Sequence, residues 1–352
     1  MSAAADRLRS RLRALAAAML LAGAAVAQAT NGAAAPRPVV SPEVRTAIDR
    51  GTTWLVRTQD AQGAWRNAGG YGISPVAMTS LAGMALLAGG PTPTRGHEWR
   101  TLRTTVDWLL LQQDREIGLF AVRGEDGQPM FGHGFATQFL ASVHGMEEDI
   151  PQQQRLQKAL QRAVRLIEAS QSPAGGWYYT PDANDDEGSV TVTQLQALRA
   201  CRQVGIVVDP RTVQRAVDYL RRCQNADGGV RYRLSVPGES RPAITAASIA
   251  SLFAAGVYDD QPFVDRAFGY CRKHLQVRVD TTNHHFYAHL YWSEALSQCS
   301  GRDFDDYWRA MSAWLLERQS RDGSWDGDGV GPVYGTAIAL RILQLPLDLV
   351  PR

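Results

Sequence analysis

The stretch QSPAGGW at residues 171–177 decides the fold, because its pattern recurs along the chain. A glutamine is followed four residues later by a glycine and, after two more, by a tryptophan. The spacing recurs at Gln59-Gly63-Trp65 and Gln319-Gly323-Trp325, without the aromatic at Gln224-Gly228-Val230, and with one extra residue at Gln113-Gly118-Phe120. A sixth unit, near residues 273–283, lacks the motif. The period is about 50 residues, which indicates a repeat architecture.

Each motif has the same surroundings. Before the fourth motif, Val213, Ala216, Val217 and Leu220 form the apolar stripe of an amphipathic helix. After it, residues 243–256 carry no charge, which is typical of a buried helix. Six such pairs are expected to close into an all-α, α/α toroid with inner and outer rings of helices. The outer helices are expected to begin near Pro42, Trp99, Gln152, Pro210, Pro262 and Phe304.

The motif residues have structural roles that follow from their chemistry. The glycine supplies a positive φ that ends the outer helix. The glutamine amide can satisfy backbone groups left open at a helix end. The indole is expected to cover that amide and to pack between neighbouring hairpins.

The first 27 residues have the pattern of a signal peptide. Four arginines precede an apolar run and the small-residue site Ala25-Val26-Ala27. We therefore expect an exported protein, periplasmic or extracellular, with a linker at 28–40 and a single domain at 41–352. Without the leader the net charge falls from +2 to about −1, which argues against nucleic-acid binding. No later stretch is long and apolar enough to span a membrane.

The repeats resemble the QW motifs of the prenyltransferase/squalene-cyclase repeat superfamily, and the resemblance covers residues 42–347. It implies an α/α toroid but no single activity, because the superfamily includes cyclases, protein prenyltransferase β-subunits and non-enzymatic complement thioester domains. The chain looks most like the exported, single-toroid repeat proteins of bacteria.

The segment GGWYYTPDANDD at residues 175–186 resembles the stretch before the Asp-x-Asp-Asp motif of squalene-hopene cyclases. That resemblance assigns proton donation to the middle aspartate, and the aligned residue here is Asn184, which cannot donate such a proton. Asp185 or Asp186 could act as the catalytic acid only if the loop is shifted. The alternative is that these residues and Glu187 cap the following helix.

The topology predicts where other polar residues gather. All turns from an outer to an inner helix lie at one end of the ring, so the inner helices begin around one mouth. The predicted mouth-binding residues are His133, Asp182, Glu187, Arg241, His285, His289 and Tyr334, with His284 beside them. Convergent polar groups around a concave opening are typical of a binding site.

The sequence predicts no metal and no cofactor. His285 and His289 have the spacing of two zinc ligands, but their aromatic neighbours favour packed histidines. The Asp-x-Cys pair that the resemblance to prenyltransferases would require is not visible. Among the four cysteines, Cys223 and Cys271 lie on neighbouring elements and are the candidate disulfide.

Two functions remain open on sequence alone. The first is a binding or scaffold protein that holds a protein partner or an apolar small molecule through its central cavity. The alternative is an isoprenoid cyclase or a prenyltransferase-like enzyme that uses the acidic and histidine residues of the mouth. The transferase is less favoured because Arg241 is the obvious basic residue there for a diphosphate.

Overall fold

The structure is a computed structural model, and it describes residues 38–67, 69–70, 72–256, 261–279, 284–299 and 302–347. The predicted signal peptide and most of the predicted linker lie outside these residues. Within them the regular structure is twelve α-helices and one 3₁₀ helix, with pairing between extended segments limited to isolated bridges. The all-α prediction is confirmed. No helix in these ranges is long and apolar enough to cross a bilayer.

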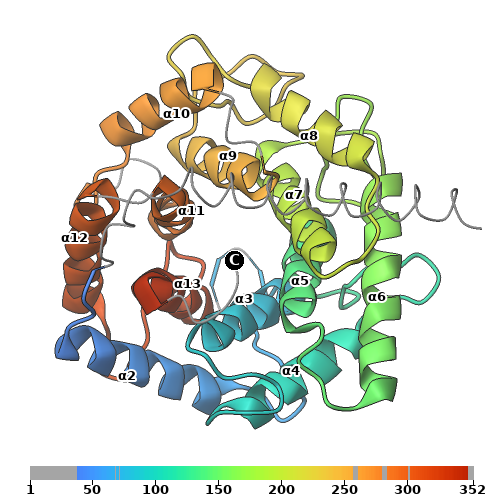
Figure 1. The fold of residues 1–352 in the computed structure, drawn as a ribbon, viewed down its shortest axis with the longest axis vertical. Coiled ribbons are helices and arrows are strands. Elements are labelled where there is room, and N and C mark those ends of the chain that lie inside the picture. The colour runs from blue at the N-terminus through green and yellow to red at the C-terminus, as the bar shows by residue number, and fades with distance from the viewer. Residues whose placement is uncertain are drawn as a thin grey trace, which may run out of the picture.

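The helices alternate along the chain between an outer and an inner ring (Figure 1). The outer ring contains α2 (Pro42–Thr58), α4 (Trp99–Leu111), α6 (Ile150–Ala169), α8 (Pro210–Arg222), α10 (Gln261–His274) and α12 (Arg302–Arg318). The inner ring contains α3 (Pro75–Ala88), α5 (Pro129–Val143), α7 (Gly188–Gln203), α9 (Pro242–Ala254), α11 (His285–Cys299) and α13 (Pro332–Gln344). A 3₁₀ turn, η1 (Leu345–Leu347), follows α13.

The pattern of buried residues differs between the outer and the inner helices, as their sequences predict. In α8 the buried positions include Val213, Ala216, Val217 and Leu220, while the arginines of the other face are more exposed. In α9 every residue from Ala243 to Phe253 is buried, because this inner helix is covered on all sides. The α/α toroid is therefore confirmed, with six hairpins in the described part of the chain.

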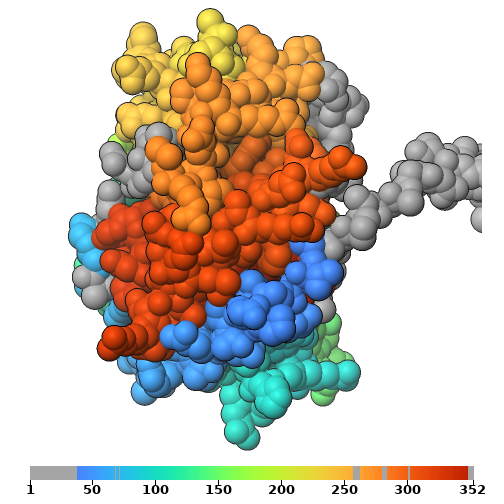
Figure 2. All heavy atoms as spheres, turned by 90° about the vertical axis from the view of Figure 1, so that its left-hand side faces the viewer, coloured from blue at the N-terminus to red at the C-terminus, as the bar shows by residue number. Residues whose placement is uncertain are grey.

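The ring closes between the last hairpin and the first. Each inner helix contacts its neighbours, and α13 contacts α3. Figure 2 shows α2, in blue, directly against the red surface of α12, and these helices are in contact. The Gln319 amide joins them by donating to the carbonyl of Ala47 at 2.9 Å.

The motif glutamine links each hairpin to the next. The amide nitrogen of Gln171 donates to the carbonyl of Gly175 in its own turn, at 2.8 Å, and to that of Thr212 in α8, at 2.9 Å. The other four motif glutamines make the same pair of bonds, from Gln59 to Gly63 and Thr101, Gln113 to Gly118 and Ala159, Gln224 to Gly228 and Phe263, and Gln319 to Gly323 and Ala47. The glutamine therefore spans two hairpins instead of capping only its own helix.

The motif glycine allows the two hairpins to approach. Gly175 has a φ of +104°, and a Cβ atom there would lie 2.3 Å from the carbonyl oxygen of Arg215 in α8. The other motif glycines approach a backbone carbonyl of the next outer helix in the same way. The pairs are Gly63 with Thr104, Gly118 with Arg162, Gly228 with Arg266, and Gly323 with Arg50. A side chain is therefore excluded both by the backbone conformation and by the neighbouring helix.

The motif tryptophan ties the turn back to its own outer helix. The indole N–H of Trp177 donates to the carbonyl of Ile167 at 2.7 Å, and its backbone N–H donates to the hydroxyl of Thr191 in α7 at 3.0 Å. Trp65 and Trp325 make equivalent bonds. All three indoles are fully buried.

All four cysteines are free thiols. Cys223 and Cys271, the candidate pair, are both buried and unbonded, so that suggestion from the sequence is wrong. Burial raises the pKa of the Cys223 thiol to about 11.

Candidate functional site

The acidic segment before α7 does not point into a common cavity. Asp182 is exposed. Asp185 pairs with the guanidinium of Arg233 at 3.0 Å, and its side chain is 40% exposed. Asp186 is buried beside the turn after α6, where one carboxylate oxygen accepts from the hydroxyl of Ser172 at 2.9 Å. The three carboxylates therefore have three different environments.

Glu187 is the N-cap of α7. Its carboxylate accepts from the backbone N–H groups of Ser189, at 2.8 Å, and Val190, at 2.5 Å. The side chain is fully buried, and burial raises its pKa above the usual range of a glutamate. Capping, one of the two roles considered for this segment, thus belongs to Glu187.

His133 lies within the fold and does not reach the mouth. It is fully buried, and its Nδ1 accepts from the backbone N–H of Phe120 at 3.1 Å. In the third hairpin the hydroxyl of Thr191 accepts from Trp177 in the same way. His133 therefore replaces a structural threonine of the repeat, and burial lowers its pKa to about 4.

His285 and His289 are packed between α11 and α12 instead of facing the central axis. The ring of His285 lies 4.6 Å from that of Trp314, and Nδ1 of His289 lies 2.9 Å from the hydroxyl of Tyr307. Burial holds the pKa of His289 well below its ordinary value. Among the described residues no three His, Cys, Asp or Glu side chains are arranged to hold a metal ion.

The two remaining predicted residues lie apart, Arg241 directly before α9 and the buried Tyr334 near the start of α13. Arg241 is exposed, with its guanidinium 6.0 Å from the ring of Tyr232. The hydroxyl of Tyr334 donates to Asp328 at 3.2 Å.

Asp328, which the sequence analysis missed, also accepts from the backbone N–H groups of Phe286, at 3.1 Å, and Tyr287, at 3.3 Å, at the start of α11. The DGDG run at 326–329, directly after the last motif, could have indicated it.

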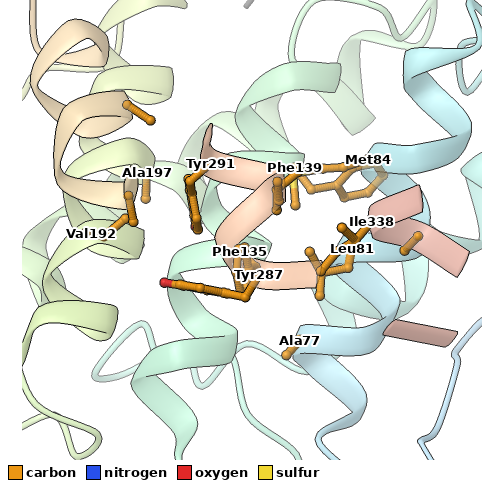
Figure 3. Close-up of a cluster of buried hydrophobic side chains, with 14 of the residues drawn as sticks. Ala77, Leu81, Met84, Phe135, Phe139, Val192, Ala197, Tyr287, Tyr291 and Ile338 are labelled. Atoms are coloured by element: carbon orange, nitrogen blue, oxygen red, sulfur yellow. The ribbon is translucent and has the colours of Figure 1, made fainter. Parts of the chain in front are cut away.

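Side chains of the inner helices fill the central axis of the ring. Figure 3 shows Phe135 and Phe139 of α5 and Tyr287 and Tyr291 of α11 pointing inward toward residues of α3, α7 and α13. All four aromatic side chains are at most 8% exposed. The toroid is therefore closed by its own core at this level.

A pocket remains at the opposite end, where the inner helices finish. It has a volume of about 160 Å³, and all six inner helices contribute to its wall. Its lining residues are Met84, Leu87, Ala88, Gln138, Ser142, Gln196, Arg199, Ala200, Gln203, Ala250, Ala254, Glu294, Gln298, Arg341, Gln344 and Leu345. None of these residues was predicted as a site residue.

The pocket wall contains polar and charged groups that are buried or half-buried. Arg341 and Glu294 form an ion pair between α13 and α11, and their side chains are 15% and 18% exposed. The amide nitrogen of Gln138 donates to the side-chain oxygen of Gln196 at 3.1 Å. A few paired polar groups of this kind in the wall of a pocket are typical of a binding site.

The comparisons with known proteins concern the fold. Residues 148–288 match the family model of the squalene-hopene cyclase C-terminal domain. A search of curated proteins found no match. The type II terpene cyclase MstE from Scytonema is 19% identical, with a TM-score of 0.60, over 88% of this chain and 100% of that chain.

Two further solved structures are similar. A protein from Actinoplanes is 20% identical, with a TM-score of 0.59, over 87% of this chain and 99% of its own. An α-1,6-mannanase from Salegentibacter is 9% identical, with a TM-score of 0.62, over the same shares. Likeness at these identities concerns the fold alone. The chain therefore has the α/α toroid fold of these structures, and its residues 148–288 are similar to the squalene-hopene cyclase C-terminal domain.

Proposed function

We propose that the chain is an exported binding protein of the single-toroid bacterial type, which receives a group of a partner or ligand in the pocket at the C-terminal ends of its inner helices. One observation supports this function most directly. The central axis is filled by Phe135, Phe139, Tyr287 and Tyr291, while the pocket beyond them remains open and is lined by charged and amide side chains.

The alternative, an isoprenoid cyclase, has less support. The neighbour MstE has been seen with geranylgeranyl dihydroxybenzoate as substrate. The pocket here, at about 160 Å³, is below the range of roughly 300–1,000 Å³ typical of small-molecule sites. A long apolar chain would have to displace the aromatic core.

The candidate acids also lack the surroundings that protonation of a double bond requires. Such an acid needs a raised pKa, which a dry apolar cavity provides. Asp185 is instead held by Arg233 and is 40% exposed. Asp186 is buried against the turn after α6, where it accepts from the hydroxyl of Ser172 at 2.9 Å, and it does not line the pocket. Export, expected from the leader, would also separate the protein from cytoplasmic isoprenoids.

Two measurements on the mature protein test this function. In the first, the protein is incubated with squalene and with geranylgeranyl diphosphate, and the extracts are examined by gas chromatography and mass spectrometry. We expect no cyclic product. A cyclic product that disappears in Asp185→Asn or in Asp186→Asn would refute the binding function.

The second measurement is native mass spectrometry of the purified protein. Ala200→Trp fills the pocket, and Ala169→Trp places the same side chain at the exposed end of α6 as a control. We expect a bound mass in the wild type and in Ala169→Trp that is lost in Ala200→Trp. A bound mass that persists in Ala200→Trp would place binding elsewhere.

A further inference from the structure

We infer that the pocket at the C-terminal ends of the inner helices binds an uncharged primary carboxamide, the group that ends an asparagine or glutamine side chain. This inference rests on the proposed function, because it names the ligand class of the same pocket. Three features of the pocket support it: the hydrogen-bonding groups that a pair of glutamines leaves over, the compensation of charge in the wall, and the volume.

Gln138 of α5 and Gln196 of α7 provide the first feature. The amide nitrogen of Gln138 donates to the side-chain oxygen of Gln196 at 3.1 Å, and no second bond joins either side-chain amide to the described part of the chain. The oxygen of Gln138 therefore remains as an acceptor, and the NH₂ group of Gln196 remains as a donor. Exchanging oxygen and nitrogen in both amides would again leave one acceptor and one donor.

Both of these groups are open to the pocket. Gln196 is only 6% exposed, yet neither its NH₂ group nor the oxygen of Gln138 is among the polar atoms of the described residues that are closed off without a partner. Both residues line the pocket. Gln344 differs, because its NH₂ group donates to the carbonyls of Ala85, at 2.9 Å, and Leu340, at 3.0 Å. The available donor and acceptor thus lie on two different helices.

A primary carboxamide matches this pair of groups. It carries its donors and its acceptor on two separate atoms, so it can bond to side chains on two helices at once. A hydroxyl has both functions on a single oxygen, and a ketone has no donor. Because a polar group that loses water without gaining a partner costs free energy, a ligand that satisfies both glutamines is favoured.

The charges of the wall favour an uncharged ligand. Arg341 is neutralised by its ion pair with Glu294, and Arg199 also has an interaction partner. The six inner helices end at this mouth, and their C-terminal carbonyl groups disfavour an anion. The guanidinium groups of the two arginines disfavour a cation. A neutral group is therefore the one that neither set of charges opposes.

The volume limits the ligand to one small group. The pocket holds about 160 Å³, close to the roughly 150 Å³ of a cavity that takes one benzene molecule. This is the size of a carboxamide with a short aliphatic stem. Met84, Leu87 and Leu345 supply apolar surface for the stem, while the rest of a larger ligand or partner would remain outside.

Ligand-observed NMR titration of the purified wild-type protein tests the inference with probes that share one branched carbon skeleton. Isobutyramide is the carboxamide, and methyl isopropyl ketone replaces its NH₂ group by a methyl group. Isobutanol carries a hydroxyl, isobutyrate a negative charge and isobutylamine a positive charge. We expect isobutyramide to bind at least about tenfold more tightly than each of the other probes.

A further probe distinguishes the source of the carboxamide. N-acetylglutamine methylamide carries the same group on a unit of polypeptide. Tighter binding of this probe than of isobutyramide would identify the side chain of a protein partner, because the backbone then adds contacts at the mouth. Weaker binding would identify a free small amide.

A pair of variants locates the binding. Gln196→Met keeps the length of the side chain and removes its hydrogen-bonding groups, so isobutyramide should bind at least about tenfold more weakly. Gln154→Met makes the same change on the exposed face of α6 and should leave the affinity unchanged. Circular dichroism shows whether both variants are folded. The comparison of probes in the wild type does not depend on either variant.

Some outcomes would overturn the inference. These are no binding of isobutyramide, equal or tighter binding of the ketone, the alcohol or a charged probe, or equal affinities in folded Gln196→Met and Gln154→Met. They would leave the proposed function standing, because that function depends on whether Ala200→Trp removes the bound mass and not on the chemical class of the ligand.

Discussion

Replacing the motif glycine by alanine should weaken the ring at the contact between two hairpins. Gly175 has a φ of +104°, and its Cβ would lie 2.3 Å from the carbonyl of Arg215. Gly205 offers a matched control, because its φ is +80° but nothing lies within 4 Å of an added Cβ. Both variants carry the strain of a positive φ, and only Gly175→Ala adds the collision.

The magnitudes follow from these two contributions. The left-handed conformation costs about 1 kcal/mol for a residue with a Cβ, so Gly205→Ala should lower the free energy of unfolding by about that amount. Separating α8 from the turn should cost about 1–3 kcal/mol more, as in overpacked cores. Gly175→Ala is therefore expected to lose about 2–4 kcal/mol in total.

Urea unfolding followed by circular dichroism measures the difference between the two variants. We expect a clearly lower midpoint for Gly175→Ala than for Gly205→Ala, with similar slopes. Equal losses would mean that the close approach of neighbouring hairpins does not stabilise the ring, and would refute this explanation of the glycine.

Three further changes test other contacts. Burial raises the pKa of Asp126 to about 6, so this group favours folding below about pH 4 and loses that contribution as the pH rises through 6. In Asp126→Asn, the decline in unfolding free energy between pH 4 and 7 should shrink by about 1–3 kcal/mol, by urea titration at both pH values. His133→Ala removes the acceptor of Phe120 and should cost about 2–4 kcal/mol in calorimetry at pH 7. Because the folded pKa of His133 is depressed, the wild type should lose more stability than this variant as the pH falls from 6.5 to 4. Trp177→Phe breaks the indole bond to Ile167 and should cost about 1–3 kcal/mol, and an unchanged thermal midpoint would contradict that role.

The fold could be predicted from sequence because its motif residues are required by local geometry. A positive φ and a close approach both demand glycine, as at Gly175, and these demands recur in every hairpin that keeps the motif. The charge pattern of α8 and the absence of charge in α9 assign them to the outer and inner rings. The hydrogen bond from Gln171 to Thr212 in the next hairpin could not be predicted, because a local sequence pattern does not identify a partner 41 residues away.

The site was harder to predict because polar residues near helix ends have two common roles. Glu187 and His133 looked available at a mouth, but both satisfy backbone N–H groups inside the fold. The pocket was missed for the opposite reason. Arg199 and Arg341 near the ends of inner helices look like ordinary favourable charges at a C-terminus. Only the packing of six helix ends shows that they surround one opening.

A crystal structure of the purified protein would show whether a bound molecule lies in the pocket or along the axis of the ring. We expect that Phe135, Tyr287 and Tyr291 remain packed across the axis, and that any bound molecule lies against Arg341 and Gln196 at the C-terminal ends of the inner helices. A long apolar molecule along the axis, with those aromatic side chains displaced toward the walls, would contradict it.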